Sequence, residues 1–456
     1  MKALLIILLG LNLTQYAFAN DTQGYFYFGN TNLVGVGPLQ DGKKSGIWKI
    51  YKRVNELDAP QESLDAVRGV EIEETFDLSK PVFLISFKEN QPDGLMEEFY
   101  PNGQTKKLVN FSNGKLNGEF FEFSESGEVL LSGKYVDNFK EGEWNSYYRN
   151  GTKKSEYTYS NNLLQGTTKT YFPSGLLAES IPFEAGKLQG TYQTFFPNGQ
   201  LQKSVEFVND LEHGEYKRFY EDGQKEVIGS YVKGELDGTW ENYDNLGALI
   251  SKGAYQAGIR VGTWKEQVAE VQGFYRVGEY TNGGKSGIWK VMDEKGAELQ
   301  EEQFADDRLV AISAFTTVDG RVLDAGKLVN GSGKRIVYDR EGHVLENGRY
   351  SKGIRTGVWF TYYPKSTAVA SSGSYSEGEK TGTWRYFGLN GESLGEEVFD
   401  SENLAESREI NPMENHNMPR QDFRRNLVAE PTSANDMQAL MRFKRHHAQS
   451  LINHSN

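Results

Sequence analysis

The sequence predicts an all-β fold: an extended, twisted single antiparallel sheet, or solenoid, of about fifteen tandem 24-residue β-hairpin repeats, with a short C-terminal helix. Three observations lead to this prediction. Glycines recur every 24 residues, an aromatic residue usually stands two positions after each glycine, and polar turns separate segments of strand length. The glycines that keep this step without a slip are Gly94, Gly118, Gly142, Gly166, Gly190, Gly214, Gly238 and Gly262.

The tryptophans follow the same period. The glycine series extends, with one-residue slips, to Gly46 upstream and to Gly287, Gly333, Gly357 and Gly382 downstream. All seven tryptophans of the chain stand two positions after a glycine of this series, the position written +2 below. They are Trp48, Trp144, Trp240, Trp264, Trp289, Trp359 and Trp384. Because strands of a hairpin array must bury their apolar side chains against neighbouring repeats, we expect these residues to be structural.

A second aromatic residue usually stands five positions after the glycine, as at Tyr147 and Tyr171. Positions +2 and +5 differ in parity, so a regular strand points them to opposite faces of the sheet. Either a bulge shifts the register, or both faces of the sheet carry aromatic residues.

Two turns punctuate each repeat. The first has the form Tyr/Phe-Pro-Asn-Gly, as at residues 100–103, and the second is polar and rich in glycine, as at residues 112–118. Proline presets φ for the first turn position, and glycine takes the left-handed site that closes a three-residue loop with a bulge. The flanking segments are rich in Tyr, Phe, Trp, Thr and Val, which favour strands. Each repeat therefore predicts one β-hairpin.

The repeat unit resembles the MORN repeat in its bacterial variant form. The segments GEWNSYYRNG (142–151), GTYQTFFPNG (190–199) and GVWFTYYPKS (357–366) carry the resemblance, which covers roughly residues 46–403. Units with Thr168, Met96 or Arg335 at +2, and the unit near residue 311 that lacks its glycine, depart from the pattern. The resemblance implies a non-enzymatic role, usually attachment to a protein partner or a membrane. Many relatives of this YwqK-like kind carry the label "antitoxin".

The N-terminus reads as a signal peptide over residues 1–19. Lys2 supplies the positive charge, an apolar segment follows, and Ala17-Phe18-Ala19 forms a cleavage site before Asn20. The apolar run of ~11 residues is too short to span a bilayer; an uncleaved anchor is the alternative. Residues 20–45 are expected to form an N-terminal cap, and residues 46–403 the repeat array. We therefore expect an exported protein, periplasmic, cell-surface or secreted, with no transmembrane helix in the mature chain. Absence of cysteine excludes a lipoprotein anchor.

The C-terminal residues break the period. Residues 404–432 read as a linker, and residues 433–456 as a basic amphipathic helix. Apolar residues fall near one helical face, and a basic cluster interrupts them: Met437, Leu440, Met441, Ala448, Leu451 and Ile452, with Arg442, Lys444 and Arg445. The helix either docks on a partner or an acidic surface, or packs on the last hairpin as the end cap that repeat arrays need.

Charge bears on the partner. The formal net charge is −13, and the tail is slightly basic, so the acidic excess lies in the repeats. An acidic surface excludes nucleic acid as a partner and disfavours simple electrostatic binding to anionic lipid. Basic residues nevertheless recur two positions before the glycine, and either form a basic stripe or serve turn solubility: Lys44, Lys140, Arg260, Lys285, Arg355 and Lys380.

The sequence predicts no catalytic, cofactor-binding or metal-binding residues, so we expect no enzyme. Gly284-Lys285-Ser286 resembles the end of a phosphate-binding loop, but the spacing is wrong and no helix is predicted after it. His213 and His343 lie far apart, and no metal-ligand spacing occurs. Two functions stay open. The chain is a scaffold that binds a protein partner, or an envelope protein that contacts lipid or surface polysaccharide through exposed aromatic residues.

Overall fold

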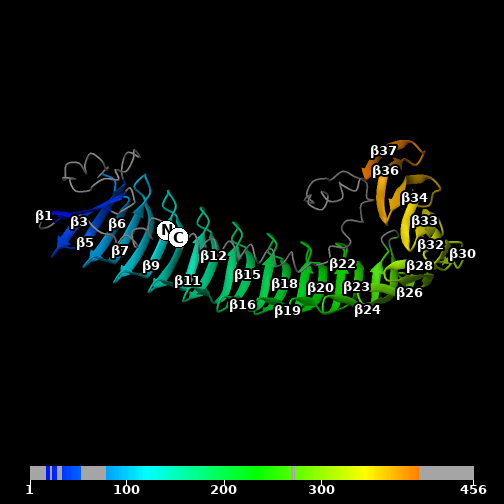
Figure 1. The fold of residues 1–456 in the computed structure, drawn as a ribbon, viewed down its shortest axis with the longest axis horizontal. Helices are drawn as coiled ribbons and strands as arrows, with labels where there is room; N and C mark the ends of the chain where they lie inside the picture. Colours follow the sequence, from blue (N-terminus) through cyan, green and yellow to red (C-terminus); the bar gives the residue numbers. More distant parts are fainter. Residues whose placement is uncertain are drawn as a thin grey trace. The chain divides into compact units, whose positions relative to one another are not determined.

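A computed structural model describes residues 17–20, 23–27, 33–52, 79–268, 271 and 273–399. The chain divides into two compact units, the first comprising Met1–Leu211 with Ser433–Asn456 and the second Glu212–Thr432. Every regular element among the described residues is a β-strand, and successive strands stack as hairpins within each unit (Figure 1). The expected all-β fold of antiparallel hairpins is confirmed. The expected helix at 433–456 and the linker at 404–432 lie outside the described residues.

The first unit contains β1 (Ala17–Asn20), β2 (Gln23–Tyr27), β3 (Leu33–Gln40), β4 (Lys43–Lys44), β5 (Gly46–Lys52), β6 (Phe83–Lys88), β7 (Gln91–Phe99), β8 (Thr105–Ser112), β9 (Lys115–Phe123), β10 (Val129–Val136), β11 (Phe139–Tyr147), β12 (Lys153–Ser160), β13 (Leu163–Leu164), β14 (Gly166–Tyr171), β15 (Leu177–Glu184), β16 (Lys187–Leu188), β17 (Gly190–Phe195) and β18 (Leu201–Val208).

The second unit begins within β19 (Leu211–Phe219) and continues with β20 (Lys225–Val232), β21 (Glu235–Leu236), β22 (Gly238–Tyr243), β23 (Leu249–Gln256), β24 (Ile259–Gln267), β25 (Phe274–Thr281), β26 (Gly284–Asp293), β27 (Glu298–Ala305), β28 (Arg308–Ile312), β29 (Phe315–Thr316), β30 (Val322–Leu323), β31 (Gly326–Val329), β32 (Ser332–Tyr338), β33 (Val344–Ser351), β34 (Ile354–Tyr362), β35 (Val369–Ser376), β36 (Glu379–Phe387) and β37 (Ser393–Phe399).

The two turns of each repeat have the geometry that their residues favour. At the first turn, the Gly103 amide donates to the Tyr100 carbonyl at 2.9 Å, and Gly103 has a φ of +85°. At the second turn, Asn113 and Gly114 both have positive φ, 49° and 77°, as a two-residue turn between paired strands requires. The Gly114 amide also donates to the Pro92 carbonyl of the preceding hairpin at 2.8 Å, so this turn links consecutive repeats.

The register of β11 and β12 settles which faces carry aromatic residues. Trp144, Asn145 and Ser146 pair in regular succession with Tyr157, Glu156 and Ser155. The register shift lies after Ser146, and the extra residue belongs to the opposite strand. Consecutive side chains from +2 to +5 therefore alternate, and both faces of the sheet carry aromatic residues.

The tryptophans fill the interior of the repeats. Their exposed fractions are 0–1%. Each of the seven stands 11 residues after a glycine on the preceding strand, and a Cβ on any of these glycines would lie within 2.6 Å of the indole ring. The pairs are Gly37–Trp48, Gly133–Trp144, Gly229–Trp240, Gly253–Trp264, Gly278–Trp289, Gly348–Trp359 and Gly373–Trp384.

Repeats with another residue at +2 carry a larger residue at the equivalent upstream position. Val109, for example, stands 11 residues before Phe120, and the two residues pair directly. The other such upstream positions in the numbered series hold Ile85, Tyr157, Ile181, Val205 and Asp324. Because protein interiors are close-packed, a large indole requires that its neighbour lack a side chain. The sequence analysis missed this pairing.

Aromatic rings also contact one another from repeat to repeat. In the second unit an unbroken series runs through Tyr216, Tyr231, Trp240, Tyr255, Trp264, Tyr280, Trp289 and Phe304, with consecutive ring centroids 5.2–6.1 Å apart. The interplanar angles in this series are 68–90°, the edge-to-face geometry that ring quadrupoles favour. This contact series supplies the neighbour-to-neighbour packing on which a repeat array depends.

The regular repeat breaks near residue 311, where the sequence lacks its glycine. β29 and β30 pair only with each other, and β31 to β37 form a separate seven-stranded sheet. The +2 position of the next repeat holds Arg335, which is 4% exposed and bonds the fully buried carboxylate of Glu302. Arg276 Nε contacts the same carboxylate at 2.8 Å. A buried ion triad thus replaces the tryptophan at this repeat.

Candidate functional site

One half-exposed aromatic ring per hairpin faces away from the tryptophans. We call this set of +5 residues the outer aromatic column: Phe99, Phe123, Tyr147, Tyr171 and Phe195 in the first unit, and Phe219 and Tyr243 in the second. Neighbouring strands lie ~4.8 Å apart, so rings of consecutive hairpins repeat at roughly 10 Å. Each ring is partly buried by its neighbours and partly open to solvent. The column therefore offers a regular series of apolar contacts along the sheet.

Charged side chains surround the column. In the first unit, Glu156 lies 2.6 Å from Lys153 Nζ and 3.9 Å from Lys169 Nζ. The hydrogen bond from Lys153 leads the effects that lower the pKa of Glu156. Burial, with a hydrogen bond to Glu156, raises the pKa of Tyr171 to about 12, so its phenol stays protonated at neutral pH.

The second unit repeats this arrangement around Glu241. The Tyr243 hydroxyl donates to Glu241 Oε2 at 2.6 Å, and Lys252 Nζ lies 2.8 Å from Glu241 Oε1. The hydrogen bond to Glu241, together with burial, raises the pKa of Tyr243 to about 12. Rings, hydroxyls, carboxylates and ammonium groups therefore alternate on the outer face, and these groups suit non-covalent contacts with a polypeptide.

Tyrosines at +6 hold the column in place. The Tyr148 hydroxyl donates to the backbone carbonyl of Tyr171 at 2.8 Å, and Tyr100 donates in the same way to Phe123 at 2.7 Å. Tyr220 bonds the Tyr243 carbonyl at 2.8 Å in the second unit. Each acceptor is the +5 residue of the next hairpin. The outer rings thus stand on backbone that is fixed before any partner arrives, which lowers the ordering cost of binding.

The residues that the sequence singled out as structural lie inside the repeats. The glycines of the series occupy bends with positive φ, for example 69° at Gly142 and 103° at Gly94. All seven tryptophans are buried, so they are not the exposed aromatic residues that the second functional hypothesis requires. The outer column holds Phe and Tyr instead. Its sequence signal was the +5 position, whose facing the sequence left undecided.

Both interpretations of the recurring basic residues fail for Lys44 and Lys140. Their exposed fractions are only 5% and 8%, so they form neither a surface stripe nor a solubilising turn. Lys140 Nζ lies 4.4 Å from the Trp144 ring centroid, and burial lowers the pKa of Lys140 to about 8. Six of the seven tryptophans have such a cation within 5.5 Å: Lys44, Lys140, Arg260, Lys285, Arg355 and Lys380.

The segment that resembles a phosphate loop belongs to this interior. Gly284 begins β26, and Lys285 Nζ lies 2.6 Å from Glu266 and 4.4 Å from the Trp289 ring centroid. The lysine therefore neutralises a carboxylate and covers an indole. Its environment confirms the interpretation as a repeat rather than a nucleotide site.

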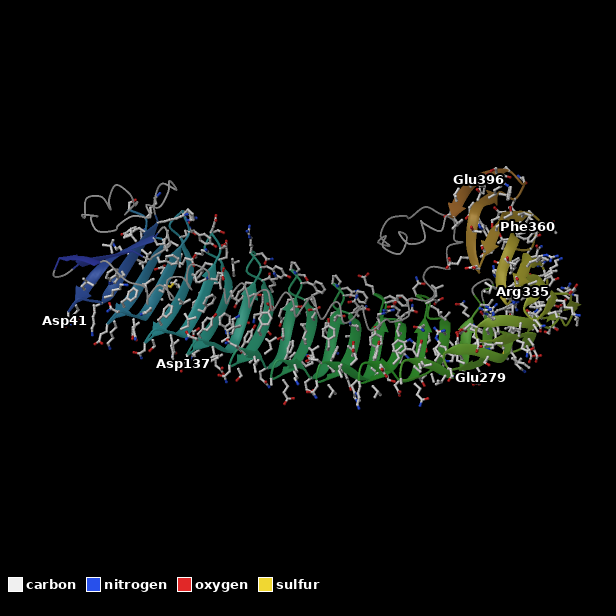
Figure 2. The ribbon with its side chains drawn as sticks, viewed as in Figure 1. Asp41, Asp137, Glu279, Arg335, Phe360 and Glu396 are labelled. Carbon is white, nitrogen blue, oxygen red and sulfur yellow. The ribbon has the colours of Figure 1, made fainter. Side chains whose placement is uncertain are left out.

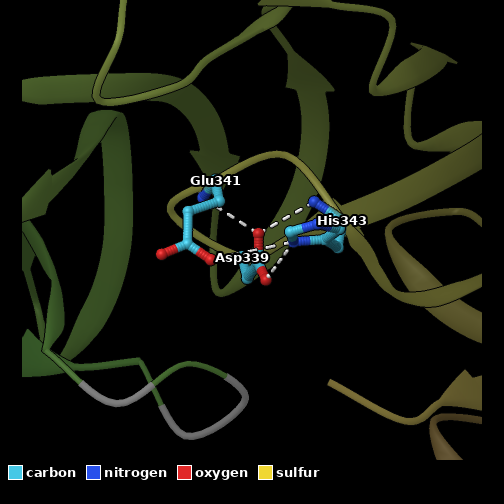
Figure 3. Close-up of side chains that lie close together, drawn as sticks. All are labelled: Asp339, Glu341 and His343. Atoms are coloured by element: carbon cyan, nitrogen blue, oxygen red, sulfur yellow. Dashed lines mark hydrogen bonds and ion pairs between the residues drawn. The ribbon is translucent and has the colours of Figure 1, made fainter. Parts of the chain in front are cut away.

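Asp339, Glu341 and His343 gather their side chains in the turn between β32 and β33 (Figure 3). Asp339 Oδ1 accepts the backbone amides of Glu341 and His343 at 2.9 and 2.8 Å, and His343 Nδ1 lies 2.9 Å from Asp339 Oδ2. Asp244 and Asp293 accept the equivalent amides in their own turns. The Asp339 carboxylate is therefore explained by turn formation, which its counterparts perform without a histidine.

The termini bear on targeting. Ala19 and Asn20, the expected cleavage site, lie in β1, which pairs with β2 through Ala17–Phe26 and Asn20–Gln23. Cleavage itself stays a prediction. Within the described residues, no helix has the length and apolar character needed to span a membrane.

Comparison with known proteins identifies the repeat. A family model described as MORN repeat variant matches residues 92–113, 140–161, 188–209 and 212–233. No curated protein sequence matches the chain.

Two solved structures are similar at 10% identity. The chain covers 84% of itself and 21% of the Tc holotoxin pore of Photorhabdus luminescens, with a TM-score of 0.16. It covers 80% of itself and 22% of a chain in the TcdB2–TccC3–Cdc42 structure, with a TM-score of 0.13. The chain thus spans about a fifth of the length of those chains, and TM-scores this low carry no argument about fold or function.

Proposed function

The chain carries MORN repeats of the variant type, and on that premise we propose that it is a non-enzymatic, exported scaffold that binds a protein partner. The outer aromatic column is the contact surface. The observation that carries this proposal is the division of labour within each hairpin: the tryptophan at +2 is sealed inside, and the ring at +5 stands half-exposed on the opposite face.

The polar surroundings of the column favour a protein over a purely apolar ligand. Tyr171 and Tyr243 each stand beside a carboxylate that also meets lysine. Tyrosine rings with charged neighbours are typical of protein interfaces, where one ring packs and its hydroxyl bonds. The acidic net charge of −13 favours a partner with a cationic surface and would speed their association at low salt.

Export is part of the proposal. Support comes from Lys2, the short apolar segment that follows and the Ala17-Phe18-Ala19 site. The final compartment is periplasm, cell surface or medium. N-terminal sequencing of the mature protein tests this: a chain that begins at Asn20 supports export, and one that retains Lys2 in the cytoplasm contradicts it.

A second function competes for the same surface. Rings repeated at roughly 10 Å on one sheet face would also suit the flat faces of a surface polysaccharide or a lipid interface. Capture from the envelope fraction of the source cells separates the two. A stoichiometric protein partner supports the scaffold, whereas retention on liposomes or glycan resin without such a partner supports the second function. The label "antitoxin" adds a toxin-like protein to the partners that capture would reveal.

A further inference from the structure

Three apolar side chains stand exposed on consecutive second turns of the first unit. Val136 is 38% exposed, Phe139 46% and Leu163 51%, and we call these three residues the apolar turn row. Val136 and Phe139 face each other across the turn between β10 and β11. Leu163 follows the next such turn, and lies where a Cβ on Gly186 of the turn beyond would touch it at 3.4 Å. The row is therefore continuous over two hairpins.

The row rests on rigid backbone. The Asn162 amide donates to the Lys140 carbonyl at 3.1 Å, and its side-chain oxygen accepts from the Lys140 amide at 2.6 Å. The Asn161 amide donates to Glu141 Oε2 at 2.9 Å. These three bonds tie the turn at 161–162 to β11. Solvent-exposed apolar side chains on such fixed turns form a preorganised contact surface.

Carboxylates outnumber cations beside the row. Asp137 stands between Val136 and Phe139 at the edge of the sheet (Figure 2), and Glu184 is exposed one hairpin beyond Leu163. Lys115 lies 3.4 Å from Asp137 and partly offsets its charge. Glu141 follows Phe139 in the same strand. A ligand that combines apolar groups with positive charge would match this edge.

The chain itself contains such a segment. We propose that residues 433–456 dock on the apolar turn row and cover it in the absence of a partner. In an acidic chain, this segment places the basic cluster Arg442, Lys444 and Arg445 between apolar residues at helical spacing. The chain continues for 57 residues after Phe399, long enough to reach any repeat at ~3.3 Å per residue. Charge complementarity and reach both favour this occupant over an uncharged apolar ligand.

The absence of cysteine makes the test specific to single sites. A benzophenone placed on Leu163→Cys in the full chain should crosslink, on irradiation, to peptides within residues 433–456. The matched control is Leu95→Cys, which is 45% exposed in the same unit but on the outer face, and should not crosslink to the tail. Charge reversal at Arg442, Lys444 and Arg445 should reduce the Leu163 crosslink several-fold, and added salt should do the same because it screens the charges.

Three results would overturn the proposal. Tail crosslinks of equal yield from Leu95→Cys would show non-specific contact. Crosslinks between isotopically distinct copies would show that the row is a contact between two chains. A tail that crosslinks to a probe on Leu394→Cys, and not to Leu163→Cys, would place it on the last strand as an end cap. The readout is independent of any partner, so failure of the scaffold proposal does not affect it.

Discussion

A methyl group added at Gly133 should disrupt the packing of Trp144. A Cβ at this position would lie 2.1 Å from Trp144 Cδ2 and 2.4 Å from Cε2, whereas carbon atoms pack at ~3.5–4.0 Å. The indole must therefore shift by roughly 1.5 Å. Such overpacking costs ~1–3 kcal/mol, and loss of the 3.2 Å bond from Trp144 Nε1 to the Lys134 carbonyl adds ~1 kcal/mol. Gly133→Ala should destabilise β10 and β11 by about 2–4 kcal/mol.

Hydrogen exchange measures this loss where it occurs, because repeat arrays open locally. Amides of β10 and β11 whose exchange depends on opening should exchange about 30- to 1,000-fold faster in Gly133→Ala. The double variant Gly133→Val with Trp144→Phe copies the pair Val109–Phe120 of the preceding repeat, and should lose over ~1 kcal/mol less than the two single variants together. Wild-type exchange in Gly133→Ala, or additive losses in the double variant, would refute the pairing of glycine with tryptophan.

Three further substitutions test the interior. Glu302→Gln leaves Arg276 and Arg335 uncompensated and should cost ~3–5 kcal/mol in chemical denaturation. Burial opposes ionisation of Glu302, but the two arginines outweigh it and lower its pKa to about 2, so its stabilising contribution is full above pH 4.5 and is lost as pH falls towards 2; acid melts of wild type and Glu302→Gln should converge there. Burial lowers the pKa of Lys140 to about 8, so the cost of its charge is present at pH 7 and disappears as pH rises past 10.5; Lys140→Met should melt within ~1 kcal/mol of wild type at pH 7, with that pH dependence gone. Tyr148→Phe removes a 2.8 Å bond to the next hairpin and should cost ~0.5–1.5 kcal/mol by hydrogen exchange; an unchanged rate would show that the bond does not fix the column.

The hairpin array could be predicted because its signals are local. Asn113 and Gly114 favour a two-residue turn by their own conformational preferences, and the 24-residue step of residues such as Gly142 and Trp144 fixes where each hairpin begins. The role of Gly133 was not found because its reason lies 11 residues away, in the indole of the following strand. A search for residue pairs across repeats, rather than for each column alone, would have found it.

The interior cations and the ion triad show a second limit. Lys140 looks like an ordinary turn lysine by sequence, and only the stacking of hairpins places it over Trp144 and buries it. Arg335 and Glu302 are 33 residues apart and meet only because the repeat between them is degenerate. The outer face was left undecided for a related reason: the register shift after Ser146 could have fallen before it, which would have turned Tyr147 inward.

The central claim is that the outer aromatic column binds a protein partner. The most direct measurement is quantitative capture from the envelope fraction by the full chain, by Tyr147→Ser with Tyr171→Ser, and by the matched control Leu163→Ser, after circular dichroism has shown that all three are folded. The account predicts that wild type and control retain one stoichiometric protein, and that the double variant loses it. Equal retention of that protein by the double variant would contradict the account.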